Sequence, residues 1–317
     1  MPQAGLALAD IQSARDVVYR ALKPTPLLKH PLLDAAAGLD VFVKHENHNP
    51  TGAFKVRGGL NLVGRLPADG RRVITASTGN HGQSIALACR HHGVPCTVVV
   101  PLGNNPEKNA AMRAYGATVL EVGRDFDEAR EYIETLPRAE HRYVHSANES
   151  DLIAGVATYA LEIFEDLPDA DVLLVPVGGG SGACGCVLAR THLGSRAQVI
   201  GVQAAGADAF ARSWRTGTRV VGDRIATFAE GMATRVTFDL PFSILREQLD
   251  GMITLSEEEL MDGVRLALSA THNLAEGAGA AALAAAIKMR DQLAGKKVVC
   301  VMSGGNIDQA TLRRILS

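Results

Sequence analysis

Lys55 is the residue of this sequence best suited to act as a nucleophile. It stands in the segment N-P-T-G-A-F-K-V-R-G, residues 49–58. A lysine held away from water has a lowered pKa, and its neutral amine can attack an aldehyde. Taken by itself, a lysine in this setting is more often a surface residue. The case for chemistry therefore depends on the segments that fold around it.

A glycine-rich segment, V-G-G-G-S-G-A-C-G at residues 177–185, is a candidate phosphate site. It lies between an apolar run and an alanine-rich stretch, the order expected of strand, turn and helix. Glycines permit a positive φ and let successive N–H groups point into one concavity at a helix N-terminus, where anions bind. The spacing matches neither a Walker turn nor a dinucleotide fingerprint. The alternative is a tight turn with close packing.

Two further segments add polar groups. The segment A-S-T-G-N-H-G-Q, residues 76–83, places hydroxyls, an amide and an imidazole at a helix start, which suits a carboxylate. Its alternative is an ordinary helix start capped by Ser77 or Thr78. The segment M-S-G-G-N, residues 302–306, follows the last apolar run, and its alternative is a simple turn.

Short β-branched runs that alternate with helical stretches must position these segments. The runs are apolar on both faces, as central parallel strands are. We expect strands at Asp40–Lys44, Arg72–Ala76, Cys96–Val100, Thr118–Val122, Asp171–Val177, Gln198–Gln203 and Lys297–Met302. We expect helices at Gln83–His92, Pro106–Tyr115, Glu149–Leu167 and Ser256–Thr271. This order predicts an α/β fold with doubly wound parallel sheets, and the glycine-rich turns fall at the carboxyl ends of strands, where ligands bind.

Composition limits the other possibilities. The 317 residues are 47% hydrophobic and 21% charged, with a formal net charge of -2, so we expect neither a nucleic-acid nor a membrane partner. The five cysteines have irregular spacings that complete no zinc pattern, and we expect reduced, buried thiols. The first residues lack the apolar core of a signal peptide, and no apolar run is long enough to span a membrane. We expect a cytoplasmic protein.

Together the four segments resemble the fold-type-II family of pyridoxal-phosphate (PLP) enzymes, in its threonine dehydratase and serine racemase branch. The motifs P-T-G-A-F-K-V-R-G, S-T-G-N-H-G-Q, G-G-G-S-G and S-G-G-N occur in the family's order and at family-like spacings, and the likeness runs from Thr25 to Asn306. It implies pyridoxal 5'-phosphate as cofactor and a two-domain, tryptophan synthase β-like fold, with parallel twisted sheets that carry helices on both faces. We expect a large domain at 1–71 and 147–317, and a small inserted domain at 72–146.

The resemblance also assigns a role to each matching residue. Lys55 is the catalytic residue, which holds the cofactor as a Schiff base and removes the Cα proton of the substrate. The cofactor-binding residues are Phe54 on the ring face, Asn80 beside the 3-hydroxyl, Ser303 facing the pyridine nitrogen, and the phosphate turn of Gly178, Gly179, Gly180, Ser181 and Gly182. The substrate-binding residues are Ser77, Thr78, Gly79, His81 and Asn148. A neutral Ser303 should leave the pyridine nitrogen unprotonated, which favours loss of a β-hydroxyl over transamination.

Three departures from the family pattern matter. Thr78 stands where serine racemase has a serine that protonates Cα, and its restricted χ1 favours one-sided chemistry. Gln203 and Ala209 stand where relatives with a cation site carry Glu and Asp, so we expect no metal. The segment I-A-G-V-A-T, residues 153–158, and Ser146 in place of a proline also differ, which leaves the exact substrate open.

The sequence thus predicts a PLP-dependent dehydratase (ammonia-lyase), a carbon–oxygen lyase that converts a β-hydroxy amino acid, L-threonine or L-serine by default, to a 2-keto acid and ammonia. We expect a homo-oligomer, in the simplest case a dimer. The alternatives are a serine or amino-acid racemase and a dehydratase for phenylserine, hydroxyaspartate or an osmolyte-derived substrate. A β-replacement enzyme is disfavoured by His81, and a binding protein without chemistry by Lys55.

Overall fold

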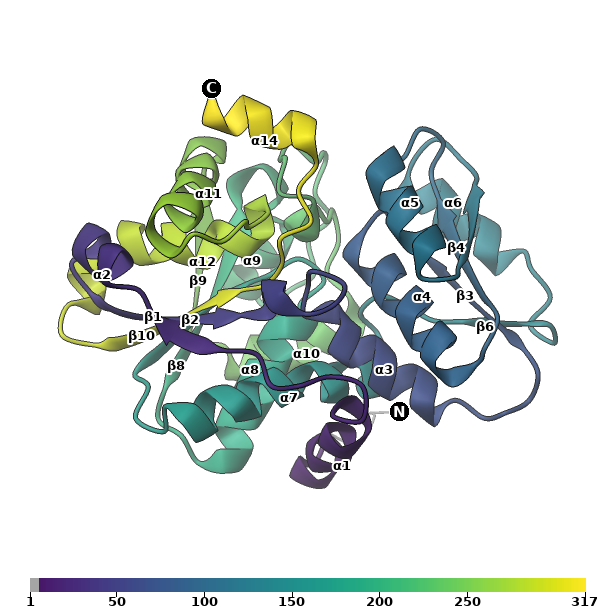
Figure 1. Ribbon diagram of the computed structural model, residues 1–317, viewed down its shortest axis with the longest axis horizontal. Coiled ribbons are helices and arrows are strands. Elements are labelled where there is room, and N and C mark those ends of the chain that lie inside the picture. Colours follow the sequence, from purple (N-terminus) through teal and green to yellow (C-terminus); the bar gives the residue numbers. More distant parts are fainter. Residues whose placement is uncertain (1–5) are drawn as a thin grey trace.

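The computed structural model describes residues 6–317, and in it the chain forms two α/β modules, each built on its own sheet (Figure 1). The strands of the smaller sheet all lie between Arg72 and Tyr143, and those of the larger sheet lie on either side of this segment. We call the two parts the small and the large module. On this division we propose domain boundaries at 1–71, 72–146 and 147–317.

The large module contains a six-stranded sheet in the order β1-β2-β10-β7-β8-β9. The strands are β1 (Leu27–Lys29), β2 (Asp40–His45), β10 (Lys297–Met302), β7 (Val172–Pro176), β8 (Gln198–Ala204) and β9 (Gly251–Leu255). All neighbours pair in parallel except β1, which runs antiparallel to β2 at the edge of the sheet. Residue-by-residue alternation along β7 sends Leu173 and Val175 into one apolar cluster and Val172 and Leu174 into the other, so both faces are buried.

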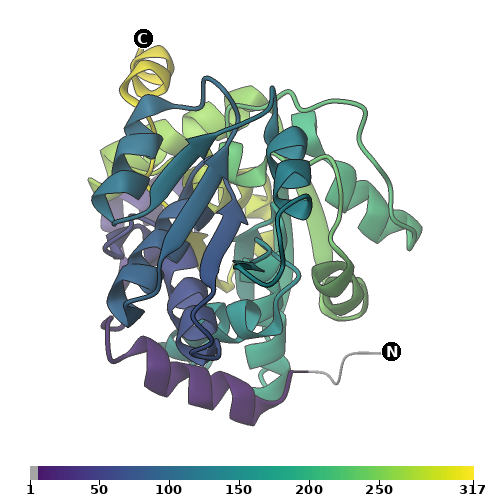
Figure 2. The same ribbon diagram turned by 90° about the vertical axis from the view of Figure 1, so that its right-hand side faces the viewer.

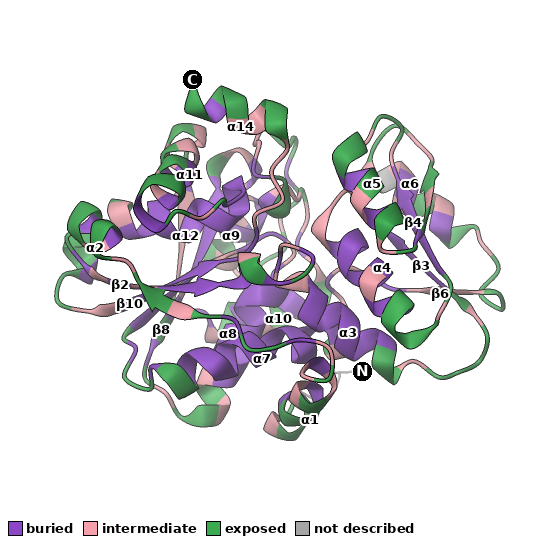
Figure 3. Ribbon diagram, in the orientation of Figure 1, coloured by how far each residue is buried: buried purple, intermediate pink, exposed green. Residues whose placement is uncertain are grey.

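Helices cover both faces of this sheet (Figure 1). The cluster on one face includes residues of α1 (Leu8–Val18), α3 (Lys55–Arg65), α7 (Ser150–Asp166), α8 (Ser181–Leu193) and α10 (Asp239–Gln248). The cluster on the other includes residues of α2 (Pro31–Ala37), α11 (Glu257–Thr271), α12 (Gly277–Lys288), α13 (Arg290–Leu293) and α14 (Gln309–Leu316). The remaining helical elements are α9 (Ala209–Thr216), η1 (Glu46–His48), η2 (Ala205–Ala207) and η3 (Glu230–Met232). Figure 3 shows the resulting buried layer along the strands and the inner helix faces.

The small module contains a four-stranded sheet in the order β5-β4-β3-β6, parallel throughout (Figure 2). Its strands are β5 (Thr118–Glu121), β4 (Cys96–Val100), β3 (Arg72–Ala76) and β6 (His141–Tyr143). Its helices are α4 (Asn80–His92), α5 (Pro106–Ala114) and α6 (Phe126–Glu134). Helix α4 packs against α3 of the large module, so the segment that carries Lys55 forms part of the contact between the modules.

The seven predicted strands and four predicted helices are present, with ends that differ by a few residues. Three short strands, β1, β6 and β9, were not expected. β1 and β6 have three residues each, too few for a periodic pattern, and all three lie at sheet edges where neither propensity nor burial marks them clearly. The antiparallel β1 is the exception to the parallel pairing that we predicted.

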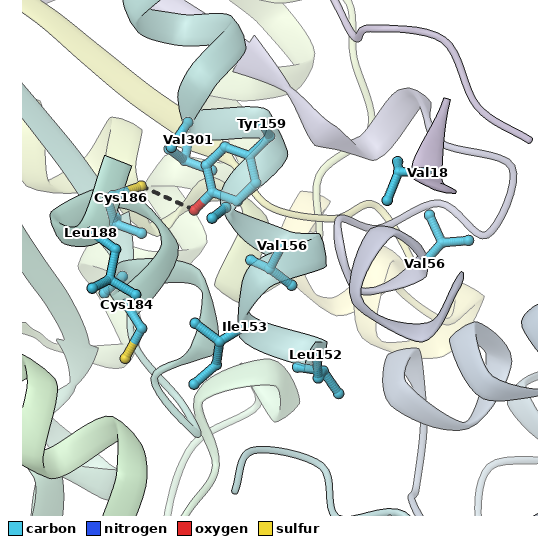
Figure 4. Close-up of a cluster of buried hydrophobic side chains, with 14 of the residues drawn as sticks. Val18, Val56, Leu152, Ile153, Val156, Tyr159, Cys184, Cys186, Leu188 and Val301 are labelled. Carbon is cyan, nitrogen blue, oxygen red and sulfur yellow. Dashed lines mark hydrogen bonds between the residues drawn. The ribbon is translucent and has the colours of Figure 1, made fainter. Parts of the chain in front are cut away.

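A large apolar cluster joins α3, α7 and α8 beneath the sheet (Figure 4). Val56, Val156 and Tyr159 are fully buried in it, and the Tyr159 hydroxyl donates to the Gly182 carbonyl oxygen at 2.8 Å. All five cysteines are buried and unpaired, as predicted. Within residues 6–317, none of the helices has both the length and the apolar character needed to cross a bilayer.

Candidate cofactor site

Lys55 is the first residue of α3, and its amine points at the glycine-rich turn. Lys55 Nζ lies 3.0 Å from Ser181 Oγ and donates to the Ser146 carbonyl oxygen at 3.2 Å. Burial lowers the pKa of Lys55 to about 8, against a smaller opposing effect of Cys184. No carboxylate pairs with this amine in the hydrogen bonds that the structure shows. The amine is therefore far more easily deprotonated than a surface lysine, as a nucleophile requires.

Two glycines bring α3 close to α7 and so fix the position of Lys55 relative to α7. A Cβ on Gly155 of α7 would lie 2.5 Å from the Arg57 carbonyl oxygen, and a Cβ on Gly58 would lie 2.7 Å from that of Leu152. Neither carbonyl belongs to a flexible side chain, so a larger residue at either position would push the helices apart. The backbone contact thus sets where the first turn of α3 begins.

A buried ionic network surrounds Arg57, which lies in the first turn of α3. Arg57 donates to Glu46 Oε2 at 2.8 Å and to Glu162 Oε1 at 2.5 Å, and Lys44 donates to Glu162 Oε2 at 2.6 Å. Burial opposes the charge on Arg57, but Glu46 and Glu162 outweigh it and raise its pKa above the ordinary value. All four side chains are buried, so removal of one partner would leave an uncompensated buried charge.

The turn of residues 178–182 has the shape of an anion-binding nest. Gly180 is the N-cap of α8 with φ of 92°, a value that L side chains rarely adopt. A Cβ on Gly178 would lie 2.1 Å from the Gly231 carbonyl oxygen, so only glycine fits there. The helix begins at Ser181, and the first N–H groups of a helix have no partner within it. These N–H groups and the helix dipole favour a phosphate at this point.

Phe54 lies beside this turn. Its ring meets the ring of Tyr159 edge to face at 6.1 Å, and a Cβ on Gly182 would lie 3.5 Å from its Cζ atom. Lys55 Nζ is 5.4 Å from the centre of the Phe54 ring. The predicted ring-stacking residue, lysine and phosphate turn are therefore brought together by the fold.

The predicted substrate loop precedes α4, whose N-cap is Gly79. The Ser77 hydroxyl accepts from the N–H groups of Gly82 at 2.8 Å and of Gly79 at 3.2 Å. We expected Ser77 or Thr78 at the N-cap, but the N-cap is Gly79. The hydroxyl that accepts from the N–H groups at this helix start is nevertheless that of Ser77, two residues earlier. Thr78 is half-buried, and its carbonyl oxygen accepts from Asn104 Nδ2 at 3.4 Å.

His81 is buried in the first turn of α4. Its Nε2 shares a hydrogen bond of 2.9 Å with Thr75 Oγ1, and its Nδ1 has no partner among the described protein atoms. Burial, with the nearby Lys55 and His145, lowers its pKa well below the usual range, so the ring is neutral. Nδ1 is thus the ring atom left for a ligand.

Asn148 is turned toward α10. Its Oδ1 accepts from the Leu240 N–H at 3.2 Å, and its own N–H donates to His145 Nδ1 at 3.0 Å. Its side-chain oxygen thus already has one donor at the start of α10, and the assignment of Asn148 to the substrate stays a prediction. Burial lowers the pKa of His145 to about 4, which keeps its Nδ1 free to accept from the loop.

Ser303 contacts the segment that carries Lys55, and Asn80 is the first residue of α4. Ser303 is buried directly after β10, and its carbonyl oxygen accepts from the Phe54 N–H at 3.1 Å. Asn80 Nδ2 donates to Glu276 Oε1 at 2.7 Å, and Asn80 Oδ1 accepts from Asn306 Nδ2 at the same distance. Glu276 was not predicted as a site residue. It stands in N-L-A-E-G-A, which carries no motif, and only the tertiary structure brings it to Asn80.

The position aligned with a cation site is occupied by other contacts. Gln203 is fully buried, and its Oε1 accepts from the Ala211 N–H at 2.9 Å. Asp208 pairs with Arg212 at 3.0 Å. Among the side chains that the structure describes, those of the metal-binding types do not gather in groups of three or more.

The residues present fit pyridoxal 5'-phosphate. The nest at 178–182 has the shape and polarity for its phosphate, the depressed pKa of Lys55 suits its aldehyde, and the face of Phe54 suits its ring. When bound, the cofactor supplies an electron sink for charge that develops at the Cα atom of an amino acid.

Comparisons with known proteins agree with this geometry. The family described as pyridoxal-phosphate dependent enzyme matches residues 18–304. The chain is 36% identical to an L-threonine ammonia-lyase of Thermotoga maritima over 98% of this chain and 78% of that protein. It is 32% identical to an L-threo-3-hydroxyaspartate ammonia-lyase of Saccharomyces cerevisiae over 97% and 95% of the two chains. The solved structure of maize serine racemase matches with a TM-score of 0.91 and 26% identity, over 99% of this chain and 97% of that chain.

The fold and the matched family define a fold-type-II enzyme whose cofactor is pyridoxal 5'-phosphate. The chain belongs to the threonine dehydratase and serine racemase branch of that family, and its reaction class is that of a carbon–oxygen lyase. The fold class, the cofactor and the enzyme class predicted from the sequence are thereby confirmed.

Proposed function

We propose that this enzyme is an ammonia-lyase that removes water from a 3-hydroxy amino acid, L-threonine or L-serine, and releases a 2-keto acid and ammonia. The contact of Lys55 Nζ with Ser181 Oγ carries the proposal, because it brings an easily deprotonated amine to the start of the phosphate turn. The names of the ammonia-lyases among the relatives support the same reaction.

In this proposal each residue of the chain has a defined task. Lys55 would hold the cofactor, and its neutral Nζ would take the Cα proton of the substrate. The start of α4 would hold the substrate carboxylate through the N–H groups that Ser77 does not cap, since the Ser77 hydroxyl accepts from those of Gly79 and Gly82. Helix α4 of the small module contacts α3, and closure of the small module over Lys55 would exclude water from the reacting atoms.

The leaving hydroxyl needs a proton, and the hydrogen bonds of Lys55 Nζ within the described part of the chain go to Ser146 and Ser181, not to a carboxyl group. The Ser181 hydroxyl lies 3.0 Å from the lysine amine, and the same turn would hold the cofactor phosphate, which would be an acid close to Lys55. We propose that the proton reaches the hydroxyl from this turn rather than from a protein carboxyl group.

The test is keto-acid release from a panel of L-threonine, L-serine, L-threo-3-hydroxyaspartate and L-phenylserine, with the purified holoenzyme. We expect the highest kcat/KM for threonine or serine. Release from none of the four would refute the proposed reaction. A clear preference for hydroxyaspartate or phenylserine would keep the reaction and replace the substrate.

A racemase is the second candidate, because Thr78 still offers a hydroxyl next to Gly79 and the fold matches that of a serine racemase. A chiral assay of L-serine and D-serine separates the two, and we expect elimination to exceed racemisation. We further propose a cytoplasmic homo-oligomer, which the five buried free thiols and the family membership support. Light scattering of the purified protein tests the oligomeric part.

A further inference from the structure

Glu276 is a buried carboxylate that does not serve its own helix. It is the N-cap residue of α12, yet its side chain makes no capping hydrogen bond there. Instead, its Oε1 accepts from Asn80 Nδ2 at 2.7 Å, across the contact between the modules. Glu276 is only 8% exposed, so the carboxylate has few other partners. A buried carboxylate at an N-cap that bonds to an amide of a different helix, rather than to an N–H of its own helix, needs an explanation.

The side-chain oxygen of Asn80, at the other end of its amide group, also has a hydrogen-bond partner. Asn306 Nδ2 donates to Asn80 Oδ1 at 2.7 Å, and it donates to the Thr51 carbonyl oxygen at the same distance. A flip of the Asn80 amide would bring its oxygen against the Glu276 carboxylate and its NH₂ group against that of Asn306. Both new contacts would be repulsive. The two neighbours therefore allow one orientation of Asn80.

Glu276 is itself fixed by the turn after β10. Its N–H donates to the Gly304 carbonyl oxygen at 3.1 Å, and a Cβ on Gly304 would lie 2.6 Å from its Oε1. Gly305 continues the contact through a hydrogen bond from its N–H to the Gly52 carbonyl oxygen at 2.8 Å. The turn that carries Ser303, the segment before Lys55 and the carboxylate thus form one connected unit.

We propose that Glu276 is a positioning residue that orients Asn80 so that the second N–H of its amide faces the 3-oxygen of the cofactor. The proposal rests on the place beside that oxygen assigned to Asn80 by family resemblance. An amide nitrogen has two donors. One is used on Glu276, and the other remains to stabilise the negative charge of a deprotonated 3-oxygen. A flipped amide would offer that oxygen only a carbonyl.

The alternative is a purely structural role for Glu276 in joining α4 to α12. The two roles differ in what they change. A structural contact affects stability, whereas an oriented donor also sets whether the 3-oxygen of the bound cofactor carries a proton. That proton changes the ratio of the visible to the near-ultraviolet absorbance of the cofactor, so a spectrum distinguishes the roles.

The groups around Glu276 shift its pKa, and this decides which variants test its hydrogen bond. Burial raises the pKa of Glu276 to about 7, while Lys108 and the hydrogen bond from Asn80 oppose the rise and Glu230 adds to it. A glutamine keeps an acceptor oxygen for Asn80 whatever the pH, and a leucine of similar size keeps none. The pair Glu276→Gln and Glu276→Leu therefore separates the hydrogen bond from packing.

The experiment compares absorbance spectra between pH 6 and 9 of the holoenzyme forms of wild type, Asn80→Ala, Glu276→Leu and Glu276→Gln. We expect Asn80→Ala and Glu276→Leu to lower the visible-to-ultraviolet ratio by about tenfold, the effect of one lost charge-assisted hydrogen bond. Glu276→Gln should stay within about twofold of wild type at pH 8, because the acceptor is retained. Glu257→Leu is the control, since the Glu257 carboxylate also accepts a hydrogen bond, but from the Phe228 backbone N–H rather than from Asn80.

The outcomes separate this proposal from the assignment on which it rests. An unchanged spectrum in Asn80→Ala would remove Asn80 from the 3-oxygen. A changed spectrum in Asn80→Ala with an unchanged one in Glu276→Leu would refute the positioning role. If Glu276→Leu does not fold, Glu276→Ala removes the same acceptor oxygen without the bulk of leucine, and it should shift the ratio in the same direction. No shift in that variant would also overturn the proposal.

Discussion

Lys55 Nζ and Ser181 Oγ lie 3.0 Å apart, although 126 positions separate them in the sequence. Lys55 begins α3 and Ser181 begins α8, so two helix N-termini meet at one point. The nucleophile and the anion-binding turn therefore face the same space. A ligand that carries both an aldehyde and a phosphate is the kind of molecule that such a pair selects.

Replacement of Lys55 tests the first half of this pair. We expect Lys55→Ala to lose more than about 10³-fold in keto-acid release, because both the covalent attachment and the Cα base are removed. The visible absorbance of the lysine-bound cofactor should disappear, while circular dichroism stays that of the wild type. Lys23→Ala, at an exposed lysine, is the matched control. Near-normal turnover in Lys55→Ala would remove the lysine from the chemistry.

The lowered pKa of Lys55 predicts a pH dependence of the cofactor-free protein. In the unfolded chain this lysine has its ordinary pKa near 10.5, and in the folded protein it has one of about 8. The unfolded state thus binds more protons between these values, so stability rises with pH across that window and is reduced by a constant amount below it. The reduction is on the order of 3 kcal/mol.

Lys55→Met should therefore stabilise the cofactor-free protein at pH 7 and lose this advantage near pH 10. Urea unfolding of both proteins at pH 7, 8.5 and 10 measures the difference. An equal gap at all three pH values would mean that packing, not ionisation of Lys55, sets it.

Glycine at position 178 is predicted to be indispensable. A Cβ there would lie 2.1 Å from the Gly231 carbonyl oxygen, so Gly178→Ala must displace backbone on one side of the nest. We expect a loss of about 2–4 kcal/mol in stability and at least about tenfold in cofactor affinity. Gly194→Ala is the control, since Gly194 has φ of 66° but open space around it, and it should cost about 1 kcal/mol without affecting the cofactor. Equal effects of the two changes would contradict the nest.

Much of this fold follows from local patterns, and the edge strands do not. Central strands such as Cys96–Val100 are short β-branched runs that are buried along their whole length, so their positions can be predicted from the local sequence. β6 at His141–Tyr143 has three half-buried residues, and only its pairing with β3 makes it a strand. Its existence depends on a neighbour almost 70 residues away.

The site shows the same division. Lys55 and the 178–182 turn could be found because each stands in a distinctive local segment. Glu276 could not be found, because its role depends on how α12 and α4 pack together, and nothing around it in the sequence indicates Asn80. The assignment of Asn148 to the substrate depends on alignment alone and stays a prediction, and only the fold shows that its Oδ1 accepts from the Leu240 N–H. Local motifs therefore identify the groups, and tertiary contacts decide their orientation.

Ser303 offers a test of the electronic argument. It is a neutral, buried residue directly after β10. Ser303→Asp would place a carboxylate where a protonated pyridine nitrogen is stabilised, which deepens the electron sink. We expect elimination to slow by roughly tenfold relative to transamination and other side reactions of the same substrate. Product analysis by chromatography measures the ratio, with Ser303→Ala as the neutral control. An unchanged ratio in Ser303→Asp would show that this position does not control the reaction.

Our last prediction is that activity does not depend on magnesium or calcium. The family resemblance places Gln203 and Ala209 where relatives with a cation site carry two carboxylates, so an amide and a methyl group replace them. Gln203 Oε1 is already used by the Ala211 N–H at 2.9 Å, and Asp208 by Arg212. A hard cation would therefore meet neither the charge nor the number of oxygens that repays the loss of its bound water. We expect keto-acid release to change by less than about twofold after treatment with a chelator, with removal confirmed by elemental analysis. Added magnesium should not raise the melting temperature. A large loss of activity that magnesium restores would show that the chain binds a cation through residues outside the segment 203–209.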